Sequence, residues 1–259
     1  MSTDIEICNL ALSHLGDRGT VTSLNTSIDQ TQQAALCAKF YPMARGTLLE
    51  EPWSFTTKRA ALSNVVNNGS LAIGATYTIL TAGSPSFAAV GATSNIAGVT
   101  FVATGVGSGL GTAQLIPDVG MTQWLYAYPL PSDFNNMLRL LPYGAPDDAG
   151  TAIAYLPRPY SIELNKNGVR MLLCNEDSPT MVYTTQVTDA TKYPATVAMA
   201  LSFLLASMIA GPLIKGDVGI AQGKSMLQNY ALWLSKSVDS DLHNRRVLPV
   251  PSPAWIAGR

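Results

Sequence analysis

The sequence predicts an α+β protein: a four-helix bundle with an antiparallel β-sheet region, a small inserted Gly-rich β-module and an extended C-terminal arm. Three observations lead to this fold class. An uncharged apolar stretch covers residues 194–214, alternating β-branched and aromatic residues recur elsewhere, and residues 60–117 contain no Asp, Glu, Lys or Arg. The first pattern is typical of a buried helix, and the other two indicate strands separated by turns.

The helix expected within the apolar stretch 194–214 is the element around which the rest of the chain is organised. Leu, Val, Met and Ile recur in it at helical spacing, while Ala and Ser fill the remaining faces. Pro194 suits a first helical turn, and Gly211-Pro212 marks the expected end. A helix that is apolar on every side is usually buried by its neighbours, so this one is predicted to be the centre of the bundle.

A membrane span is the alternative interpretation of the same stretch, because about 20 apolar residues suffice to cross a bilayer. It would make the protein a membrane-inserted ejection protein. Ser202, Ser207 and the Gly-Pro break are more typical of a core helix in a soluble bundle. We therefore expect no contact with a membrane.

Three further helices complete the predicted bundle. Capping boxes, in which Ser or Thr is followed three residues later by Glu or Gln, mark two of the starts. The pairs are Thr3 with Glu6, before a short helix that stops at Gly16, and Ser27 with Gln30, before a longer helix that ends near Glu50. The last helix is expected at residues 217–242, with its apolar face made by Ile220, Met226, Leu227, Tyr230, Trp233 and Leu234.

Strands are expected wherever apolar and polar residues alternate between turn residues. Asn167-Gly168 is the strongest hairpin signal in the chain, since this dipeptide favours a two-residue turn. The expected strands lie at residues 53–59, 77–81, 86–90, 99–104, 124–128, 137–141, 161–164, 169–174 and 181–186. The pattern at 124–141 is interpreted as a return to the sheet that begins near Trp53.

The change in composition sets the predicted domain boundaries. Residues 1–63 and 123–242 are expected to form the core, residues 64–122 the inserted β-module, and residues 243–259 the extended arm. The arm holds three prolines at alternating positions, which exclude a helix and favour an extended backbone. Trp255 and Ile256 offer apolar area that requires a partner, so the arm is the predicted interface. Its candidate contact residues are Val250, Pro251, Pro253, Trp255, Ile256 and Arg259.

Charge and cysteine content exclude several classes of function. The formal net charge is −1 and 13% of residues are charged, so a firm grip on DNA phosphates is not expected. Cys8, Cys37 and Cys174 lack CxxC spacing and are expected to be buried thiols. No signal peptide is visible at the N-terminus, so synthesis in a reducing cytoplasm is expected.

Catalytic constellations are missing from the sequence. His14 and His243 are isolated, which leaves neither a metal cluster nor a nucleophilic triad, and no cofactor motif occurs. Three acidic pairs could serve glycoside hydrolysis, but adjacent carboxylates beside Pro, Gly or Ser are typical of solvated turns. The pairs are Glu50-Glu51, Asp147-Asp148 and Glu176-Asp177. The prediction is a protein that is not an enzyme and that has no metal or cofactor.

Four groups of residues together form a familiar pattern along the chain. They are Cys37, Tyr41, Arg45, Leu48, Leu49, Trp53, Phe55 and Arg59; Tyr128, Pro129, Leu130, Pro131 and Asp133; Tyr183, Thr184, Val187, Thr188 and Asp189; and Trp255, Ile256 and Arg259. In these residues and their order the chain resembles the head-to-tail adaptor proteins of tailed bacteriophages, called tail tubular protein A in short-tailed phages.

The resemblance implies a virion protein of the tail or neck that forms a ring, expected to have twelve subunits, beneath the portal protein. A tail nozzle protein similar to tail tubular protein B would attach below, tail fibres are further candidate partners, and double-stranded DNA would pass through with transient, non-specific contact. Near-neutral charge suits such a channel. The alternative is a phage-borne cell-wall or polysaccharide hydrolase, suggested by the uncharged β-module.

Overall fold

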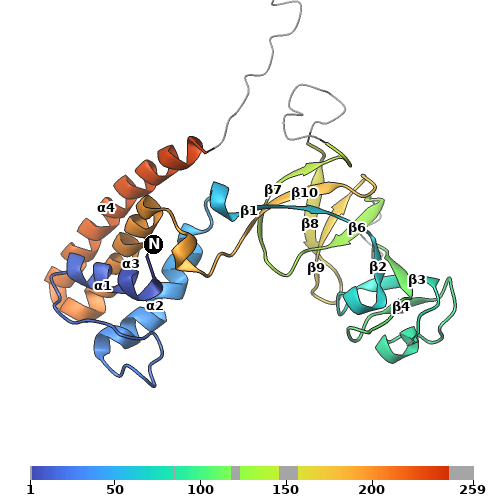
Figure 1. The fold of residues 1–259 in the computed structure, drawn as a ribbon, viewed down its shortest axis with the longest axis horizontal. Helices are drawn as coiled ribbons and strands as arrows, with labels where there is room; N and C mark the ends of the chain where they lie inside the picture. The colour runs from blue at the N-terminus through green and yellow to red at the C-terminus, as the bar shows by residue number, and fades with distance from the viewer. Residues whose placement is uncertain (1, 85, 118–122, 146–156, 245–259) are drawn as a thin grey trace, which may run out of the picture. The chain divides into compact units, whose positions relative to one another are not determined.

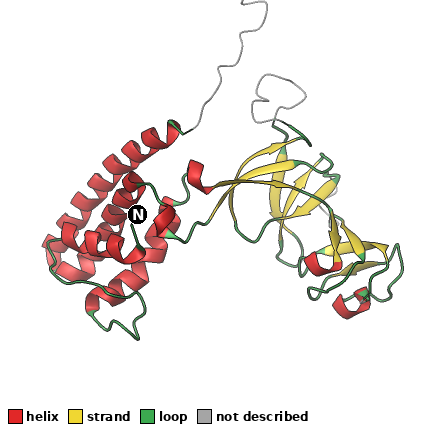
Figure 2. Ribbon diagram, viewed as in Figure 1, coloured by secondary structure: helices red, strands yellow, loops and turns green. Residues whose placement is uncertain are grey.

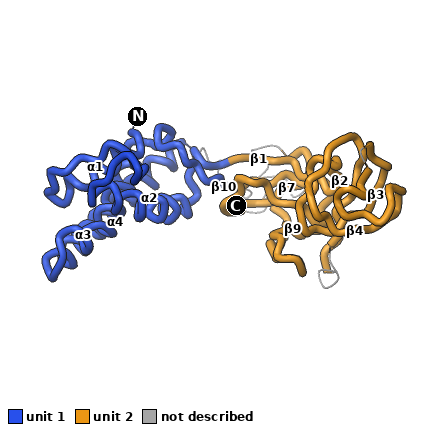
Figure 3. Tube along the Cα trace, turned by 90° about the horizontal axis from the view of Figure 1, so that it is seen from below, with its two compact units in different colours: residues 1–57, 184–247 blue, residues 58–183, 248–259 orange. Residues whose placement is uncertain are grey.

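The computed structural model describes residues 2–84, 86–117, 123–145 and 157–244. The predicted α+β class is confirmed: the described residues form four α-helices and three small antiparallel sheets. The chain divides into two compact units (Figure 3), of which the first holds residues 1–57 and 184–247 and the second holds residues 58–183 and 248–259. The α-helices all belong to the first unit, whereas the helical turns coloured red among the strands of the second unit are the short 3-10 helices Asn68–Ser70 and Phe87–Val90 (Figure 2).

Helix α1 (Asp4–His14) begins at the predicted capping box. The Thr3 side chain accepts a hydrogen bond from the Glu6 backbone at 3.2 Å, and the Glu6 carboxylate accepts one from the Thr3 backbone at 2.8 Å. The chain leaves the helix through Gly16, whose φ of +76° suits glycine. Local chemistry alone therefore fixes both ends of this helix.

Helix α2 (Gln32–Leu48) starts later than its predicted capping box, because Thr31 and not Ser27 is the N-cap. The Thr31 hydroxyl accepts from the Ala34 backbone at 3.2 Å. Asp29 holds Thr31 in place by accepting from its hydroxyl at 2.7 Å, and it also accepts from the Thr22 backbone at 2.8 Å. These contacts belong to the preceding loop, so a short sequence pattern could not reveal them.

Helix α3 (Ala195–Ile214) follows Pro194 directly and is buried along most of its length, as predicted. It does not end at Gly211-Pro212: the helix continues for one more turn to Ile214. Leu213 and Ile214 pack against the main apolar core, and this packing offsets the hydrogen bond that a proline removes. Helices α1, α2 and α4 all contact α3 (Figure 1).

Helix α4 (Gly216–Leu242) has nearly the predicted bounds, but its predicted apolar face is divided. Met226, Tyr230 and Trp233 pack on the core, whereas Ile220 and Leu227 are 56% and 50% exposed. Because α4 packs mainly on one helix, α3, it buries a narrower face than its sequence offers.

The strands form three sheets with simple orders. The first sheet has the order β1-β10-β7, the second β2-β5-β3-β4 and the third β6-β9-β8. Their bounds are β1 Thr57–Ala61, β2 Val65–Asn67, β3 Thr76–Thr81, β4 Thr100–Val102, β5 Thr112–Leu115, β6 Tyr126–Pro129, β7 Phe134–Leu141, β8 Tyr160–Leu164, β9 Arg170–Cys174 and β10 Thr180–Thr185. The predicted hairpin is present, with β8 antiparallel to β9 and a turn in which Gly168 has a φ of +77°.

Several strand predictions were wrong in detail. Residues Ser54–Thr56 and Phe87–Val90 are short 3-10 helices instead of strands, because the Trp53 and Ser86 backbones lead into tight turns. The short strands β2 and β5 had not been predicted. Of the segments expected to rejoin the first sheet, β7 does so, whereas β6 pairs with β9 in the third sheet.

The four-stranded sheet consists of residues within the stretch 64–122, but the apolar core beneath it also includes residues of β9. One apolar cluster contains Tyr77, Ile79 and Phe87 from this stretch together with Met171 and Leu173 of β9. The Asn165 and Asn167 side-chain amides also donate to the Gly74 carbonyl, at 2.9 and 2.6 Å. Within this unit the two sheets are therefore joined by both apolar and polar contacts.

Candidate interaction surfaces

The inner face of α4 approaches α3 closely through small residues. A Cβ atom added at Gly219 would lie 3.0 Å from the Ala210 carbonyl oxygen, and one added at Gly223 would lie 3.2 Å from that of Ser207. Both distances are shorter than usual Cβ contacts, so a larger residue at either position would require the facing α3 backbone to move by a few tenths of an ångström. Helix α4 packs closely on α3 along this face, and its opposite face is turned away from α3.

An apolar line runs along one exposed flank of α4, and we call it the α4 stripe. Its members recur at intervals of three, four or seven residues, which places them on one side of a helix. They are Ile220, Leu227, Ala231, Leu234, Val238 and Leu242. Leu242 is 57% exposed and Ala231 is also exposed, whereas Leu234 and Val238 are half-buried against the core. This stripe can bind an apolar partner.

Several residues that carry the resemblance join segments of the helical unit. The Trp53 indole donates to the Leu48 carbonyl at 2.8 Å and is 1% exposed. The Arg45 guanidinium lies over the Tyr41 ring and donates to the Thr188 carbonyl at 3.4 Å. These contacts link α2 to the chain that enters α3, so their role within the subunit is structural.

Asp133, another of these residues, ties three segments of the β unit together. Its carboxylate accepts from Lys58 at 2.6 Å and from the Tyr183 hydroxyl at 3.0 Å. The Lys58 hydrogen bond lowers the pKa of Asp133 below its usual value, while burial and the bond to Asp133 raise the pKa of Tyr183 to about 12. The carboxylate is therefore a fixed, ionised acceptor that holds β1, β10 and the turn before β7 together.

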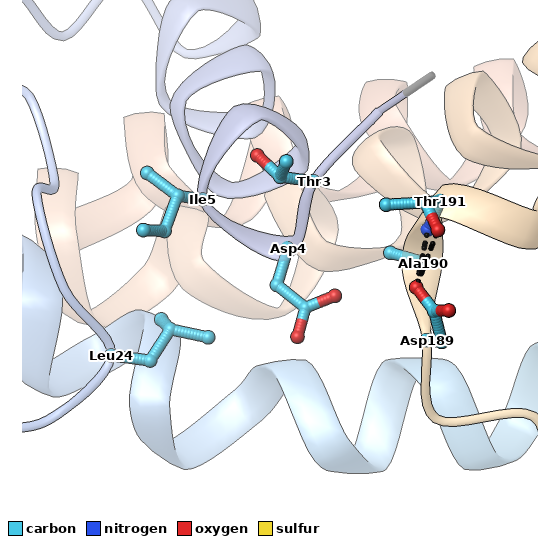
Figure 4. Close-up of a pocket in the computed structure, with 7 residues that line it drawn as sticks. All are labelled: Thr3, Asp4, Ile5, Leu24, Asp189, Ala190 and Thr191. Carbon is cyan, nitrogen blue, oxygen red and sulfur yellow. Dashed lines mark hydrogen bonds between the residues drawn. The ribbon is translucent and has the colours of Figure 1, made fainter.

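A shallow cavity of about 360 Å³ opens between the start of α1 and the short helix Ala190–Lys192 of the helical unit (Figure 4). Its polar groups are already engaged in structural contacts. Asp4 accepts from the Tyr41 hydroxyl at 2.8 Å, and Asp189 accepts from the Thr191 hydroxyl at 2.6 Å. The cavity is lined by Thr3, Asp4, Ile5, Leu24, Asp189, Ala190 and Thr191, a set without a nucleophile and base in contact.

The described residues include no group of three metal-ligating side chains. Of the acidic pairs, Glu50 and Glu51 are exposed at the end of α2, and Glu176 pairs with Arg158 at 2.8 Å. The three cysteines are buried and free, and a hydrogen bond with Cys37 together with burial raises the pKa of the Cys8 thiol. A buried thiol with a raised pKa is a poor nucleophile, which applies to Cys8.

By length and composition α3 is the one helix among the described residues that could cross a membrane. Its most apolar window is 56% buried inside the protein, and the core helix of a soluble protein passes the same test. Ser202 on this helix is fully buried and contacts His14 of α1, which ties α3 to its neighbours.

The predicted interface residues lie outside the described residues, as does the pair Asp147-Asp148. These interface residues are Val250, Pro251, Pro253, Trp255, Ile256 and Arg259. The α4 stripe was not predicted as a surface, although the spacing of Ile220, Leu227 and Leu234 by seven residues was a visible signal. Sequence alone assigned these side chains to the core.

No protein-family model matches the chain, and no curated protein matches it either. The resemblance to phage adaptors therefore stays a prediction that follows from the residues themselves.

Proposed function

We propose that the protein is a structural virion protein, a ring-forming head-to-tail adaptor that joins the portal protein to the tail nozzle and lines the DNA passage. The observation that carries this proposal is the α4 stripe, an apolar flank on a helix that packs closely on α3. A monomer gains nothing by leaving such a line of side chains in water, whereas a subunit of a ring can bury it in assembly.

Two further features support the proposal. The residues that carry the resemblance include the contacts on which the subunit depends, among them Trp53 to Leu48 and Asp133 to Tyr183. The chain has low net charge, which suits a conduit that must release DNA. In this proposal the four helices form a bundle around α3, and twelve subunits form the ring with α4 near a subunit boundary.

Native mass spectrometry tests the proposal. The purified protein is measured alone and with purified portal protein of the same phage. The expected result is a portal complex whose mass rises by twelve subunits of 27.4 kDa each. Unchanged portal and adaptor masses at micromolar concentrations of both proteins contradict the proposal.

A second measurement separates the adaptor from a hydrolase. The protein is incubated with peptidoglycan and with capsular polysaccharide, and released reducing sugar is quantified against buffer. No release is expected, because the described carboxylates lie in structural contacts or in solvent. Release that disappears in Glu176→Gln, but persists in the control Glu50→Gln, would identify a hydrolase.

A further inference from the structure

The α4 stripe is about 33 Å long, because Leu242 lies 22 positions after Ile220 and a helix rises by about 1.5 Å per residue. Nothing among the described residues of the helical unit covers its most exposed members, Ile220, Leu227 and Leu242. The stripe is narrow and straight, which suits an extended peptide better than a broad globular surface.

We propose that residues 247–259 of a second copy of this chain dock along the α4 stripe. The inference rests on the proposed function, because it names the surface on which each ring subunit receives the arm of its neighbour. The composition of the arm suits the apolar α4 stripe, since Val, Leu, Trp and Ile are separated by prolines that lack a backbone N–H. Prolines also restrict the free arm, so less conformational entropy is lost on docking.

The lengths of the two partners agree. An extended proline-rich chain advances about 3.1 Å per residue, so residues 247–259 span about 40 Å. Helix α4 has 27 residues and is therefore about 40 Å long. The arm can thus follow the stripe from one end of the helix to the other.

The charges at the ends of the two partners are also complementary. The sequence from Arg245 to Arg259 holds three arginines and no acidic residue, with two arginines at its start and one at its end. Helix α4 has an exposed carboxylate near each end, Asp217 and Asp239, and its two lysines, Lys224 and Lys236, lie between them. Neither of these carboxylates forms an ion pair with another described residue. The arm therefore brings a cation to each end of the helix.

The distribution of exposed apolar area sets the direction of the arm. Trp255 is its largest apolar side chain and should cover the end of the stripe that has two large exposed residues, Ile220 and Leu227, instead of the end where Leu242 stands alone. An antiparallel arm achieves this, because a start of Arg246 near Asp239 places Trp255 about 28 Å further along, near Ile220, with Arg259 toward the Asp217 end of the helix.

The backbone conformation at the end of α4 favours docking of the arm on a second copy over docking on the same subunit. His243 keeps a helical backbone, with φ of −67° and ψ of −20°. Neither His243 nor Asn244, the last described residues, has the positive φ with which a chain usually reverses after a helix. The described chain therefore does not turn back along its own α4, which favours the α4 stripe of a neighbour as the docking surface.

The test is a cross-linking experiment in which each partner carries one new cysteine. Lys224→Cys lies on α4 one turn from both Ile220 and Leu227, and Ala254→Cys lies in the arm. The two single variants of the full chain are mixed with the portal protein and treated with a short bis-maleimide. Because they are separate chains, a Lys224→Cys to Ala254→Cys product forms only between subunits. The native cysteines are buried and are not expected to react.

Ser225→Cys is the matched control, since it is equally exposed but lies on the opposite flank of α4. We expect the Lys224→Cys product to exceed the control by more than about tenfold, because apposed thiols react at millimolar effective concentration. Equal yields overturn the inference. So does a double variant, Lys224→Cys with Ala254→Cys, that links within one chain and never between chains.

A charge placed on the stripe gives an independent readout. Leu227→Glu should abolish the cross-link, whereas Leu232→Glu, at a position that is 65% exposed on the other flank, should leave it intact. Equal loss or equal retention in both variants contradicts the proposed surface. Native mass spectrometry of the same samples separates the two proposals. Rings that form without the cross-link reject only the contact between the arm and α4. The absence of rings rejects the adaptor function as well.

Discussion

The imidazole ring of His14 stacks on the ring of Phe203, with centroids 3.9 Å apart and planes 8° from parallel. The His14 Nε2 atom also lies 3.1 Å from the Ser202 hydroxyl, which itself donates to the Met199 carbonyl at 2.7 Å. Since the serine proton is already used, Nε2 carries the hydrogen in this contact. One side chain of α1 thus makes both a ring contact and a polar contact with α3.

This contact predicts a pH dependence of stability. Burial lowers the pKa of His14 below its usual value of 6.5, so the unfolded chain binds the proton more readily than the folded protein does. The neutral ring therefore contributes its full stabilisation above pH 6.5. This contribution declines as the pH falls from 6.5 through the pKa that His14 has in the folded protein. Thermal unfolding from pH 8 to pH 5 measures the effect, and His14→Gln should flatten this part of the profile. An unchanged profile in that variant contradicts the assignment.

The end of α4 is held by Asp241, which predicts a second effect on stability. Its carboxylate is 9% exposed and accepts from the Ser54 backbone at 2.9 Å and from the Ser54 hydroxyl. Asp241→Ala leaves these donors without their acceptor and should cost about 1–3 kcal/mol of unfolding free energy. Urea denaturation measures the loss. The exposed neighbour Asp239→Ala is the control, and a similar loss there would show that the Ser54 contact is not the cause.

Two helical glycines predict opposite effects of the same substitution. Gly46 of α2 is exposed, and an added Cβ would meet nothing within 4 Å, so Gly46→Ala should stabilise the protein by about 0.5–1 kcal/mol. Gly219→Ala would press against the Ala210 carbonyl and should destabilise it despite the better helix propensity. Melting temperatures of both variants check the difference in sign. Stabilisation by both would mean that α3 and α4 do not pack closely at Gly219.

The arm predicts a loss of assembly without a loss of folding. Trimming the chain after Leu248 should leave a soluble subunit with an unchanged melting temperature, because the expected contacts of the arm are made with another subunit. Trp255→Ala alone should weaken association by about 2 kcal/mol or more, as is usual for a buried tryptophan anchor. Incorporation of each variant into portal-bearing heads is the measurement. Reduced thermal stability of the isolated subunit, with assembly retained, would place the arm on its own helical unit.

Short-range chemistry made part of the fold predictable. The capping box of α1, the hairpin at Asn167-Gly168 and the uncharged helix α3 each depend on residues only a few positions apart, and each was found from sequence. The start of α2 was misplaced because Thr31 is supported by Asp29 and Thr22 across a loop. The end of α3 was placed too early because packing retains a turn that Pro212 alone would not favour.

Only one half of the candidate interface, the arm, was predictable from the sequence. Proline spacing and Trp255 were enough to select the arm as an interface, since both depend on composition alone. The surface that could receive it was not predictable, because Ile220 and Leu227 share a helix with the buried Met226 and have the same apolar character. Sequence determined that α4 is apolar on a wide face. Tertiary structure decided which part of that face is buried, because α4 packs mainly on α3 and a single helix neighbour covers only one side of it.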